Sequence, residues 1–320
     1  MAHFDLPVPE LRSYRATDIP PADFDEYWSA ALAEAAGHPL RATFTPVHSG
    51  YAAVRTFDVS FAGAGGASIA GWLHLPAFAP GPYPAVVEYL GYSGSRGLPH
   101  QRIEYAAAGY AHFVMDTRGQ SPDTVDPADD DGAPLWGIVT RGLLHPARNY
   151  YKRVFVDAAR ALDAIAAHDE VDPSRVAVAG VSQGGGIAIA AASLSDVPSL
   201  ALVDVPFLCH FSRAVRLTDT DPYGAISRYL ARYPGRADAA FATLSYVDGV
   251  HHAARVDLPV LMSVAFMDPT CPPSTVFAAF NNWRGSDKEI VEYPFNGHEG
   301  GDQLQLRRRL DWLAARWPGV

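Results

Sequence analysis

The most constraining feature of this chain is the five-residue stretch Gly180-Val181-Ser182-Gln183-Gly184. An apolar run, 176–179, precedes it, and a run of small residues, 185–192, follows it. This order predicts a buried strand, a sharp turn and a helix, the setting in which a strained turn exposes a serine hydroxyl. The glycines at both ends would let the strand and the helix approach closely. Such a short pattern also arises by chance in a chain rich in Gly and Ala, so its context has to decide.

Two further residues supply what an activated serine needs, a base and an acid that orients the base. Asp268 follows a nearly all-apolar run, 258–266, which is typical of a parallel strand buried on both faces. His298 lies in a glycine-framed loop just past a second short strand, 289–294. We expect both at the same sheet edge as Ser182, because open α/β sheets bind ligands at the carboxyl ends of their strands. Singly, Asp268 could be a turn residue before proline and His298 a surface histidine, but the order Ser, Asp, His favours a catalytic set.

The negative charge that develops during acyl transfer needs two backbone N–H donors. In this arrangement one donor comes from the residue after the nucleophile, which is Gln183, and the other from the loop after an earlier strand. Residues 84–90 predict that strand, and Tyr92 in the Gly-Tyr-Ser-Gly loop behind it is the expected second donor. The same loop could instead be an ordinary turn with an aromatic side chain on the surface.

Composition and charge narrow the class of protein. The chain has 320 residues, of which 48% are hydrophobic and 19% charged, enough to bury a large core in one α/β domain. The formal net charge of -10 disfavours partners that attract clustered Lys and Arg, so we expect neither nucleic acid nor a membrane. Residues 307–309 are three arginines in an amphipathic segment, 304–313, and we expect them on its solvated face.

The absence of targeting and metal-binding motifs in the sequence leads to expectations about the compartment and the cofactors. The start of the chain has no charged and apolar segments of a secretory signal, and no apolar run is long enough to span a bilayer, so we expect a cytoplasmic protein. Cys209 and Cys271 could pair only once, and we expect free thiols. The acidic stretch 126–132 lacks EF-hand spacing and predicts a solvated loop, while His251-His252 lacks partners at zinc-ligand spacing. We therefore expect no metal and no cofactor.

The predicted elements indicate a single domain, 1–320, that begins with an N-terminal extension, 1–50. Apolar residues at helical spacing predict a helix over 23–36 of this extension. Asp23 and Glu26 at its start resemble a capping box. We expect this helix to pack outside the sheet.

The rest of the chain predicts a sheet with helices around it. Alternating segments 54–61 and 67–75 indicate an antiparallel hairpin. From residue 84, strands and helices alternate, which predicts a mainly parallel sheet with right-handed crossovers. The expected strands there are 84–90, 112–116, 176–179, 201–205, 258–266 and 289–294, and the expected helices are 102–108 and 150–167. A helical insertion, 207–250, would act as a lid or a wall over the site, or only as core or oligomer contact.

Several motifs together resemble carbohydrate esterase family seven, the acetyl xylan esterases and cephalosporin C deacetylases of the α/β-hydrolase fold. The three-part signature of that family is similar to Arg118-Gly119-Gln120, Gly180-Val181-Ser182-Gln183-Gly184 and His298-Glu299. The similarity extends over nearly the whole chain and includes 204–211 and 271–279. The resemblance implies an α/β-hydrolase fold, with a mainly parallel central sheet flanked by helices.

The resemblance also implies roles for single residues. Ser182 would be the nucleophile, His298 the general base and Asp268 the acid that orients it. The backbone amides of Tyr92 and Gln183 would form the oxyanion hole.

Two more implications concern the surroundings of the site and the assembly. Arg118 and Gln120 would be mainly structural and would brace the loops near the turn with charge-assisted hydrogen bonds. Members of the family form homohexamers, trimers of dimers, so we expect a homo-oligomer of that kind.

The expected activity is hydrolysis of acetyl esters of small substrates, such as acetylated xylo-oligosaccharides and cephalosporin C, through an acetyl-enzyme intermediate. An alternative is another serine hydrolase of the same fold, a general carboxylesterase or a peptidase. A protein that only binds or scaffolds is a further class, against which the complete Ser, Asp and His set argues. The sequence leaves open which alcohol the natural substrate carries.

Overall fold

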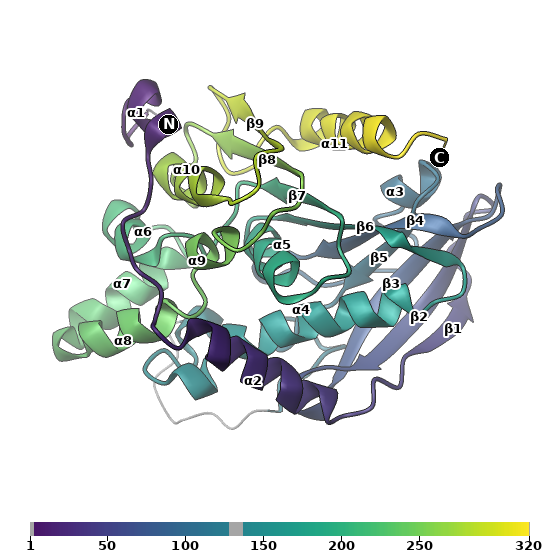
Figure 1. Ribbon diagram of the computed structural model, residues 1–320, viewed down its shortest axis with the longest axis horizontal. Helices are drawn as coiled ribbons and strands as arrows, with labels where there is room; N and C mark the ends of the chain where they lie inside the picture. Colours follow the sequence, from purple (N-terminus) through teal and green to yellow (C-terminus); the bar gives the residue numbers. More distant parts are fainter. Residues whose placement is uncertain (1–2, 128–136, 320) are drawn as a thin grey trace.

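The computed structural model describes residues 3–127 and 137–319, and Figure 1 shows the arrangement of their helices and strands. The strands are β1 (Thr43–Val47), β2 (Val54–Ala62), β3 (Ser68–Pro76), β4 (Tyr83–Tyr89), β5 (Ala111–Met115), β6 (Val171–Val181), β7 (Leu200–Asp204), β8 (Val260–Ala265) and β9 (Lys288–Tyr293). Within the described residues they form one nine-stranded sheet in the order β1-β2-β3-β5-β4-β6-β7-β8-β9. Pairings among β1, β2, β3 and β5 are antiparallel, and those from β5 through β4 to β9 are parallel. The prediction of a mainly parallel sheet is confirmed.

The antiparallel edge follows the alternation of the sequence. β2 and β3 pair along their full lengths, and Val59, Phe61 and Leu73 point into the core. The turn between the strands is a short 3-10 helix, η1 (Ala64–Gly66), whose two glycines have φ of 63° and 74°. Left-handed backbone of this kind costs glycine little, which is why the hairpin turns here. The predicted hairpin is confirmed, and each of its four strand ends lies within one residue of the prediction.

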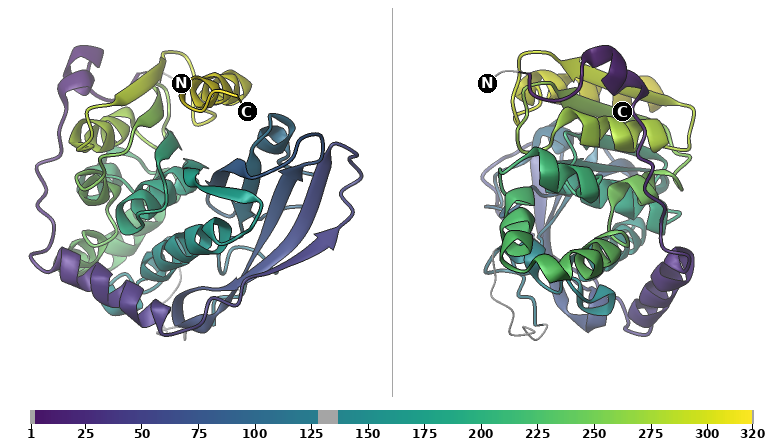
Figure 2. Two further views of the ribbon diagram at one scale, coloured as in Figure 1. Left: turned by 45° about the vertical axis from the view of Figure 1, so that its right-hand side comes forward. Right: turned by 90° about the vertical axis from the view of Figure 1, so that its left-hand side faces the viewer.

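Two layers of helices cover the sheet. The helices are α1 (Val8–Ser13), α2 (Phe24–Ala36), α3 (Glu104–Ala107), α4 (Tyr150–Ala166), α5 (Gln183–Leu194), α6 (Phe211–Leu217), α7 (Tyr223–Arg232), α8 (Ala237–Leu244), α9 (Gly249–Ala253), α10 (Pro273–Asn282) and α11 (Asp302–Arg316). Figures 1 and 2 show α3 and α11 on one face, and α4 and α5 with α9 and α10 on the other. Each face has its own core: Leu202 and Trp312 belong to the smaller one, under α11, and Phe155 and Ile187 to the larger one. This is the α/β-hydrolase arrangement that the motifs predict.

The N-terminal extension packs on the outside of this frame. In Figure 1 α2 lies along α4, and the ring of Trp28 stacks on that of Phe155 with centroids 5.7 Å apart. The helix predicted over 23–36 is confirmed, but the predicted capping box is wrong. Asp23 makes no side-chain cap and instead accepts a hydrogen bond of 2.6 Å from the hydroxyl of Tyr246. The local sequence pattern predicted that Asp23 would cap the helix, but its carboxylate binds Tyr246, which is distant in sequence.

Residues 207–250 contain the helices α6, α7 and α8 and end in α9. They contact one another and two short 3-10 helices, η2 (Ile138–Thr140) and η3 (Pro146–Arg148). A third 3-10 turn, η4 (Pro234–Arg236), joins α7 to α8. The helical character expected for this segment is confirmed.

The three arginines of α11 do not all face solvent, so the expectation of one solvated basic face is wrong for Arg309. Its side chain is 7% exposed and pairs with the buried carboxylate of Asp204. Arg307 is exposed and pairs with Asp311 one turn further along the same helix. Position 309 shares the sheet-facing side of α11 with Trp312, and β7 supplies the partner charge that makes burial of a guanidinium tolerable there.

The prediction that the acidic stretch 126–132 is a solvated loop is wrong for Asp126. Residues 129–132 lie outside the described residues, but Asp126 has only 1% of its side chain exposed. Its carboxylate pairs with Arg118, Arg141 and Arg153. Burial alone would raise the pKa of Asp126, but the arginines outweigh burial and lower it. The ionised carboxylate of Asp126 therefore holds three arginine side chains together inside the fold.

Two further expectations concern thiols and membranes. Cys209 and Cys271 are buried free thiols, as predicted. Among the helices of the described residues, none combines the length and the apolar character that crossing a bilayer requires.

Candidate active site

The turn between β6 and α5 holds Ser182 in a strained backbone conformation. Its φ of 57° and ψ of -120° lie where residues with a Cβ are rarely found. Hydrogen bonds fix this conformation from two sides. The Ser182 N–H donates to the carbonyl of Asp204 at 2.9 Å, and the Ser182 carbonyl accepts from the N–H of Phe207 at 2.9 Å. β7 and the segment after it therefore clamp the turn.

Two glycines allow the turn to form. A Cβ on Gly180 would lie 2.1 Å from the backbone carbonyl carbon of Gly184. A Cβ on Gly184 would lie 2.0 Å from the carbonyl oxygen of Tyr89, at the end of β4. Both distances are far below van der Waals contact, so the close approach of β4, β6 and α5 requires glycine at both positions.

Ser182, Asp268 and His298, predicted from their order, meet at the carboxyl edge of the sheet. His298 Nε2 lies 2.9 Å from Ser182 Oγ, and His298 Nδ1 lies 2.8 Å from Asp268 Oδ2. Asp268 follows β8 and His298 follows β9, so parallel strand order delivers both to the end of β6. The distances fit an imidazole that donates from Nδ1 to the carboxylate and accepts the serine hydroxyl at Nε2.

The carboxylate of Asp268 is fully buried and held by backbone donors. The N–H groups of Thr270 and Cys271 donate to Oδ1 at 2.8 and 3.0 Å, which leaves Oδ2 for the histidine. A backbone hydrogen bond of 3.1 Å from Met267 to Asn296 ties the aspartate loop to the histidine loop. The acid is thus fixed in position, and the imidazole is oriented through it.

The two predicted oxyanion donors, Tyr92 and Gln183, come from different elements that one side chain joins. Gln183 is the first residue of α5, so its N–H has no partner within the helix. The N–H of Tyr92 has no acceptor in the part of the chain that the structure describes. Gln120 accepts from the N–H of Ser93 at 2.6 Å and donates to the side-chain oxygen of Gln183 at 2.8 Å. Its amide therefore sets the Tyr92 loop against the start of α5.

Two tyrosines that the sequence analysis did not single out support this amide pair. The Tyr150 hydroxyl accepts from Gln120 at 2.9 Å, and the Tyr151 hydroxyl donates to Gln183 at 3.0 Å. Both tyrosines are fully buried at the start of α4. The signal was present in the sequence as two adjacent tyrosines at the start of the helix, because a buried phenol needs a polar partner.

Arg118 lies one step away from the turn. It is 1% exposed and binds Asp157 through two hydrogen bonds of 2.5 and 2.6 Å, with a third of 3.2 Å to the carbonyl of Ala64. Its own carbonyl accepts from the Tyr150 hydroxyl at 2.5 Å. Arg118 thus joins η1 to α4. Its carbonyl also accepts from Tyr150, and the same hydroxyl group binds Gln120.

The surroundings of Ser182 are aromatic and tightly packed. Phe207 is fully buried and meets the ring of Tyr92 edge to face, with centroids 6.4 Å apart. Cys271 is also fully buried, and burial raises the pKa of its thiol well above the usual range. Its sulfur, a carboxylate oxygen of Asp268 and a ring nitrogen of His298 lie within 4.8 Å of one another. Such donors suit a soft divalent metal in kind, but the acid and the histidine already bind each other.

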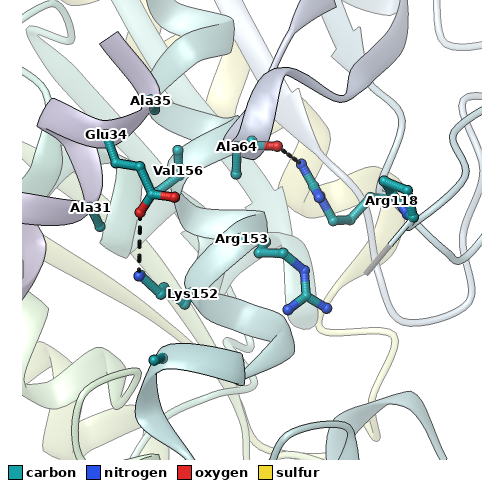
Figure 3. Close-up of a pocket in the computed structure, with 11 residues that line it drawn as sticks. Ala31, Glu34, Ala35, Ala64, Arg118, Lys152, Arg153 and Val156 are labelled. Atoms are coloured by element: carbon teal, nitrogen blue, oxygen red, sulfur yellow. Dashed lines mark hydrogen bonds and ion pairs between the residues drawn. The ribbon is translucent and has the colours of Figure 1, made fainter. Parts of the chain in front are cut away.

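A cavity of about 240 Å³, shown in Figure 3, lies elsewhere in the molecule, between α2, η1 and the start of α4. Its charged side chains have partners: Lys152 lies 3.9 Å from Glu34, and Arg153 binds Asp126. None of the three predicted catalytic residues lines it. We therefore do not connect it with the chemistry at Ser182.

The sheet order and the hydrogen-bonded serine, histidine and aspartate define this protein as a hydrolase of the α/β-hydrolase class. Residues 1–316 match the sequence model of the acetyl xylan esterase (AXE1) family. The chain belongs to the acetyl xylan esterase family. The family predicted from the motifs is confirmed.

Individual relatives agree with this assignment. A solved acetyl xylan esterase from Paenibacillus sp. R4 is 39% identical, with a TM-score of 0.92, over 97% of this chain and 99% of its own. Acetyl xylan esterase 1 from Thermoanaerobacterium sp. JW/SL YS485 is 34% identical, with a TM-score of 0.89, over 96% and 99%. The acetyl esterase Axe7A of Xylanibacter ruminicola is 27% identical over 309 residues, which are 92% of this chain. The chain spans 66% of the length of that curated relative.

The glycine requirement of the turn leads to a first prediction. Gly184→Ala should destabilise the fold by about 3 kcal/mol or more, because its methyl group would meet backbone atoms that have no room to move. The matched control is Gly235→Ala in η4, where a Cβ meets nothing within 4 Å. Thermal unfolding followed by circular dichroism compares the two. Equal melting temperatures for Gly184→Ala and the control would contradict the role of Gly184.

Proposed function

We propose that this protein is a serine esterase that hydrolyses acetyl esters of small substrates, such as acetylated xylo-oligosaccharides and cephalosporin C, through an acetyl-enzyme intermediate. One observation carries the proposal: Ser182, His298 and Asp268 form an unbroken hydrogen-bonded chain on a strained turn, in a member of the acetyl xylan esterase family. The two solved relatives with 39% and 34% identity are acetyl xylan esterases, which supports the substrate class.

In the proposed first half-reaction Ser182 Oγ attacks the acetyl carbonyl carbon while His298 Nε2 takes its proton. Asp268 stays ionised and stabilises the imidazolium through Nδ1. The tetrahedral intermediate then collapses, the bond to the alcohol oxygen breaks, and His298 returns the proton to that oxygen. In the second half-reaction a water attacks the acetyl-enzyme by the same route and releases acetate. The steps use only groups of this chain and need no cofactor.

The negative oxygen of the intermediate would be held by the backbone N–H groups of Tyr92 and Gln183. The relative positions of these two N–H groups depend on Gln120. Its side chain accepts from the N–H of Ser93, next to Tyr92, and donates to the side chain of Gln183. We assign Gln120 and Arg118 a structural role, because their contacts run to loops and helices and not to Ser182.

We further propose that residues 1–320 form one domain, with 1–50 as an N-terminal extension and 207–250 as a helical insertion that walls the site. Side chains of both segments, such as Trp28 and Phe207, belong to the same core cluster as the sheet, which supports this division. Two buried free thiols support a cytoplasmic location, where thiols stay reduced.

The nucleophile can be tested directly. Ser182→Ala should lower kcat on 4-nitrophenyl acetate by roughly 10⁴ to 10⁶, since the other groups cannot form an acetyl-enzyme without the hydroxyl. Ser245→Ala, which removes an exposed hydroxyl that donates to the carbonyl of Ala242, serves as the control and should keep full activity. Near wild-type turnover in a folded Ser182→Ala protein would reject the site, and turnover of peptides but not of esters would favour the peptidase alternative.

The packed surroundings predict selectivity for short acyl chains. Tyr92, Phe207 and the turn at 271–273 crowd the sheet edge where the acyl group must sit, and each methylene without room costs about 1 to 3 kcal/mol. Acetate should therefore react well, butyrate less well and octanoate poorly. Values of kcat/KM for the three esters of one phenol decide the question. Equal or rising values with chain length would show a wide cleft.

We also expect a homohexamer, since members of the family resembled form trimers of dimers. Closed symmetry is the usual outcome for soluble homo-oligomers, which supports such an assembly. Sedimentation velocity at micromolar concentration should give a mass near six chains. A purely monomeric mass at all concentrations would contradict the proposal.

A further inference from the structure

The start of the chain, residues 3–20, runs beside α10, as Figure 1 shows, and we call it the N-terminal strap. Its first described residue contacts both segments that lead to the catalytic acid and base. The ring of His3 meets that of Phe266 with centroids 6.0 Å apart, and its Nε2 lies 3.2 Å from the carbonyl oxygen of Pro294. Phe266 leads into the loop of the aspartate, and Pro294 into the loop of the histidine. The strap is therefore placed to influence how these two loops are held.

The N-terminal end of α10 takes its cap from this strap. Pro272 stands at the cap position and has no polar side chain, and Pro273 after it has no N–H to donate. The N–H of Ser274, which follows, donates to Asp5 Oδ2 at 2.7 Å. A residue distant in sequence thus supplies the acceptor that a helix start ordinarily takes from the residue before it. The partial positive charge of the helix end also favours a carboxylate there.

The carboxylate of Asp5 is buried among several donors. Its side chain is only 2% exposed. Besides the bond to Ser274, its Oδ1 accepts from Arg213 Nη2 of α6 at 3.0 Å and from the N–H of Leu6 at 2.8 Å. Arg213 in turn donates from Nε to Ser274 Oγ at 2.6 Å, so the three side chains form a closed set. A buried carboxylate with charged and backbone donors holds its partners in one geometry.

The helix start that Asp5 holds follows directly on the turn that orients the catalytic acid. The N–H groups of residues 270–271, in this turn, donate to Asp268 Oδ1. At the other end of the turn, the hydroxyl of Thr218, just after α6, donates to the carbonyl of Pro269. Asp5 fixes the end where α10 begins. The turn is therefore held at both ends, and the position of its backbone donors depends on both contacts.

Resting on the function proposed above, we infer that Asp5 is a positioning residue for the reaction: its carboxylate fixes the start of α10 and, through it, the turn that holds Asp268 against His298. Asp5 acts through this turn and not on the substrate. Loss of the carboxylate removes the acceptor of the Ser274 N–H and frees one end of the turn. A misplacement of about 1 Å in a catalytic group can cost about a hundredfold in rate, so a small shift of the acid is enough to slow the reaction.

The test measures kcat and KM on 4-nitrophenyl acetate. Asp5→Ala should lower kcat by about ten- to a hundredfold and change KM by less than about twofold, because the groups that meet the substrate stay in place. Asp5→Asn keeps an oxygen for the Ser274 N–H but loses the charge, so its kcat should lie between the two. The matched control is Asp18→Ala, which removes another strap carboxylate, one that accepts from Ser212 at 2.6 Å and lies 3.0 Å from His210 Nδ1. It should keep kcat within about twofold.

A double-mutant cycle separates positioning of the acid from a general loss of structure. Asp268→Asn removes the charge that Asp5 is inferred to place. Since Asp5 acts through Asp268, Asp5→Ala should cost much less in kcat in the Asp268→Asn protein than in the wild-type protein. Equal costs in the two backgrounds would overturn the inference, because they would show independent effects. Circular dichroism shows whether each variant is folded, and where Asp5→Ala is not, Asp5→Asn takes its place in the cycle.

The outcomes also separate this inference from the proposed function. Wild-type kcat in a folded Asp5→Ala protein, or an equal loss of kcat in Asp18→Ala, would overturn the positioning role while Ser182-dependent hydrolysis by the wild-type protein still upheld the esterase. A rise in KM with kcat unchanged would overturn it too, because it would assign Asp5 to substrate binding. Absence of Ser182-dependent ester hydrolysis in the wild-type protein would overturn both.

Discussion

The close approach of three backbone segments at one turn is the constraint on which the rest of the structure depends. β4, β6 and α5 come so near at Gly180 and Gly184 that a Cβ at either position would overlap main-chain atoms. This contact forces Ser182 into a left-handed conformation, and β7 and the segment after it hold it there by hydrogen bonds to both sides of its backbone. Strain at the nucleophile is therefore maintained by the same parallel strands that form the core, which is the usual condition for strain to persist.

Buried polar pairs place everything else relative to that turn. The carboxylate of Asp268 is held by two backbone donors and in turn orients His298, while Gln120 spaces the loop of Tyr92 from the start of α5. On the opposite face of the sheet, Asp204 joins the turn to Arg309 of α11. The carboxylates of Asp268 and Asp204 are buried, so their contacts are worth more than the same bonds at the surface and are costly to leave incomplete. Asp204 thus connects the turn at Ser182 with α11 on the far face of the sheet.

The fold and most of the candidate site could be anticipated because their signals are local. Apolar runs marked the parallel strands, alternation marked the hairpin of β2 and β3, and the order of Ser182, Asp268 and His298 pointed to residues that the structure brings together. The errors share one cause. Asp23 was assigned to a helix cap, Asp126 to a solvated loop and Arg309 to a solvated helix face, and in each case a residue distant in sequence bound the charged group instead.

The sequence by itself determined the periodicity of the elements and the glycines that permit the turn at Ser182, because these depend on residues near one another along the chain. It also determined the family, through short motifs that lie far apart along the chain. Only the tertiary structure decided which buried charges pair and that Tyr150 and Tyr151 hold the amides of Gln120 and Gln183. The physical reason is that a buried charge or amide is stable only beside its partner, and the partner's position is set by how strands and helices pack.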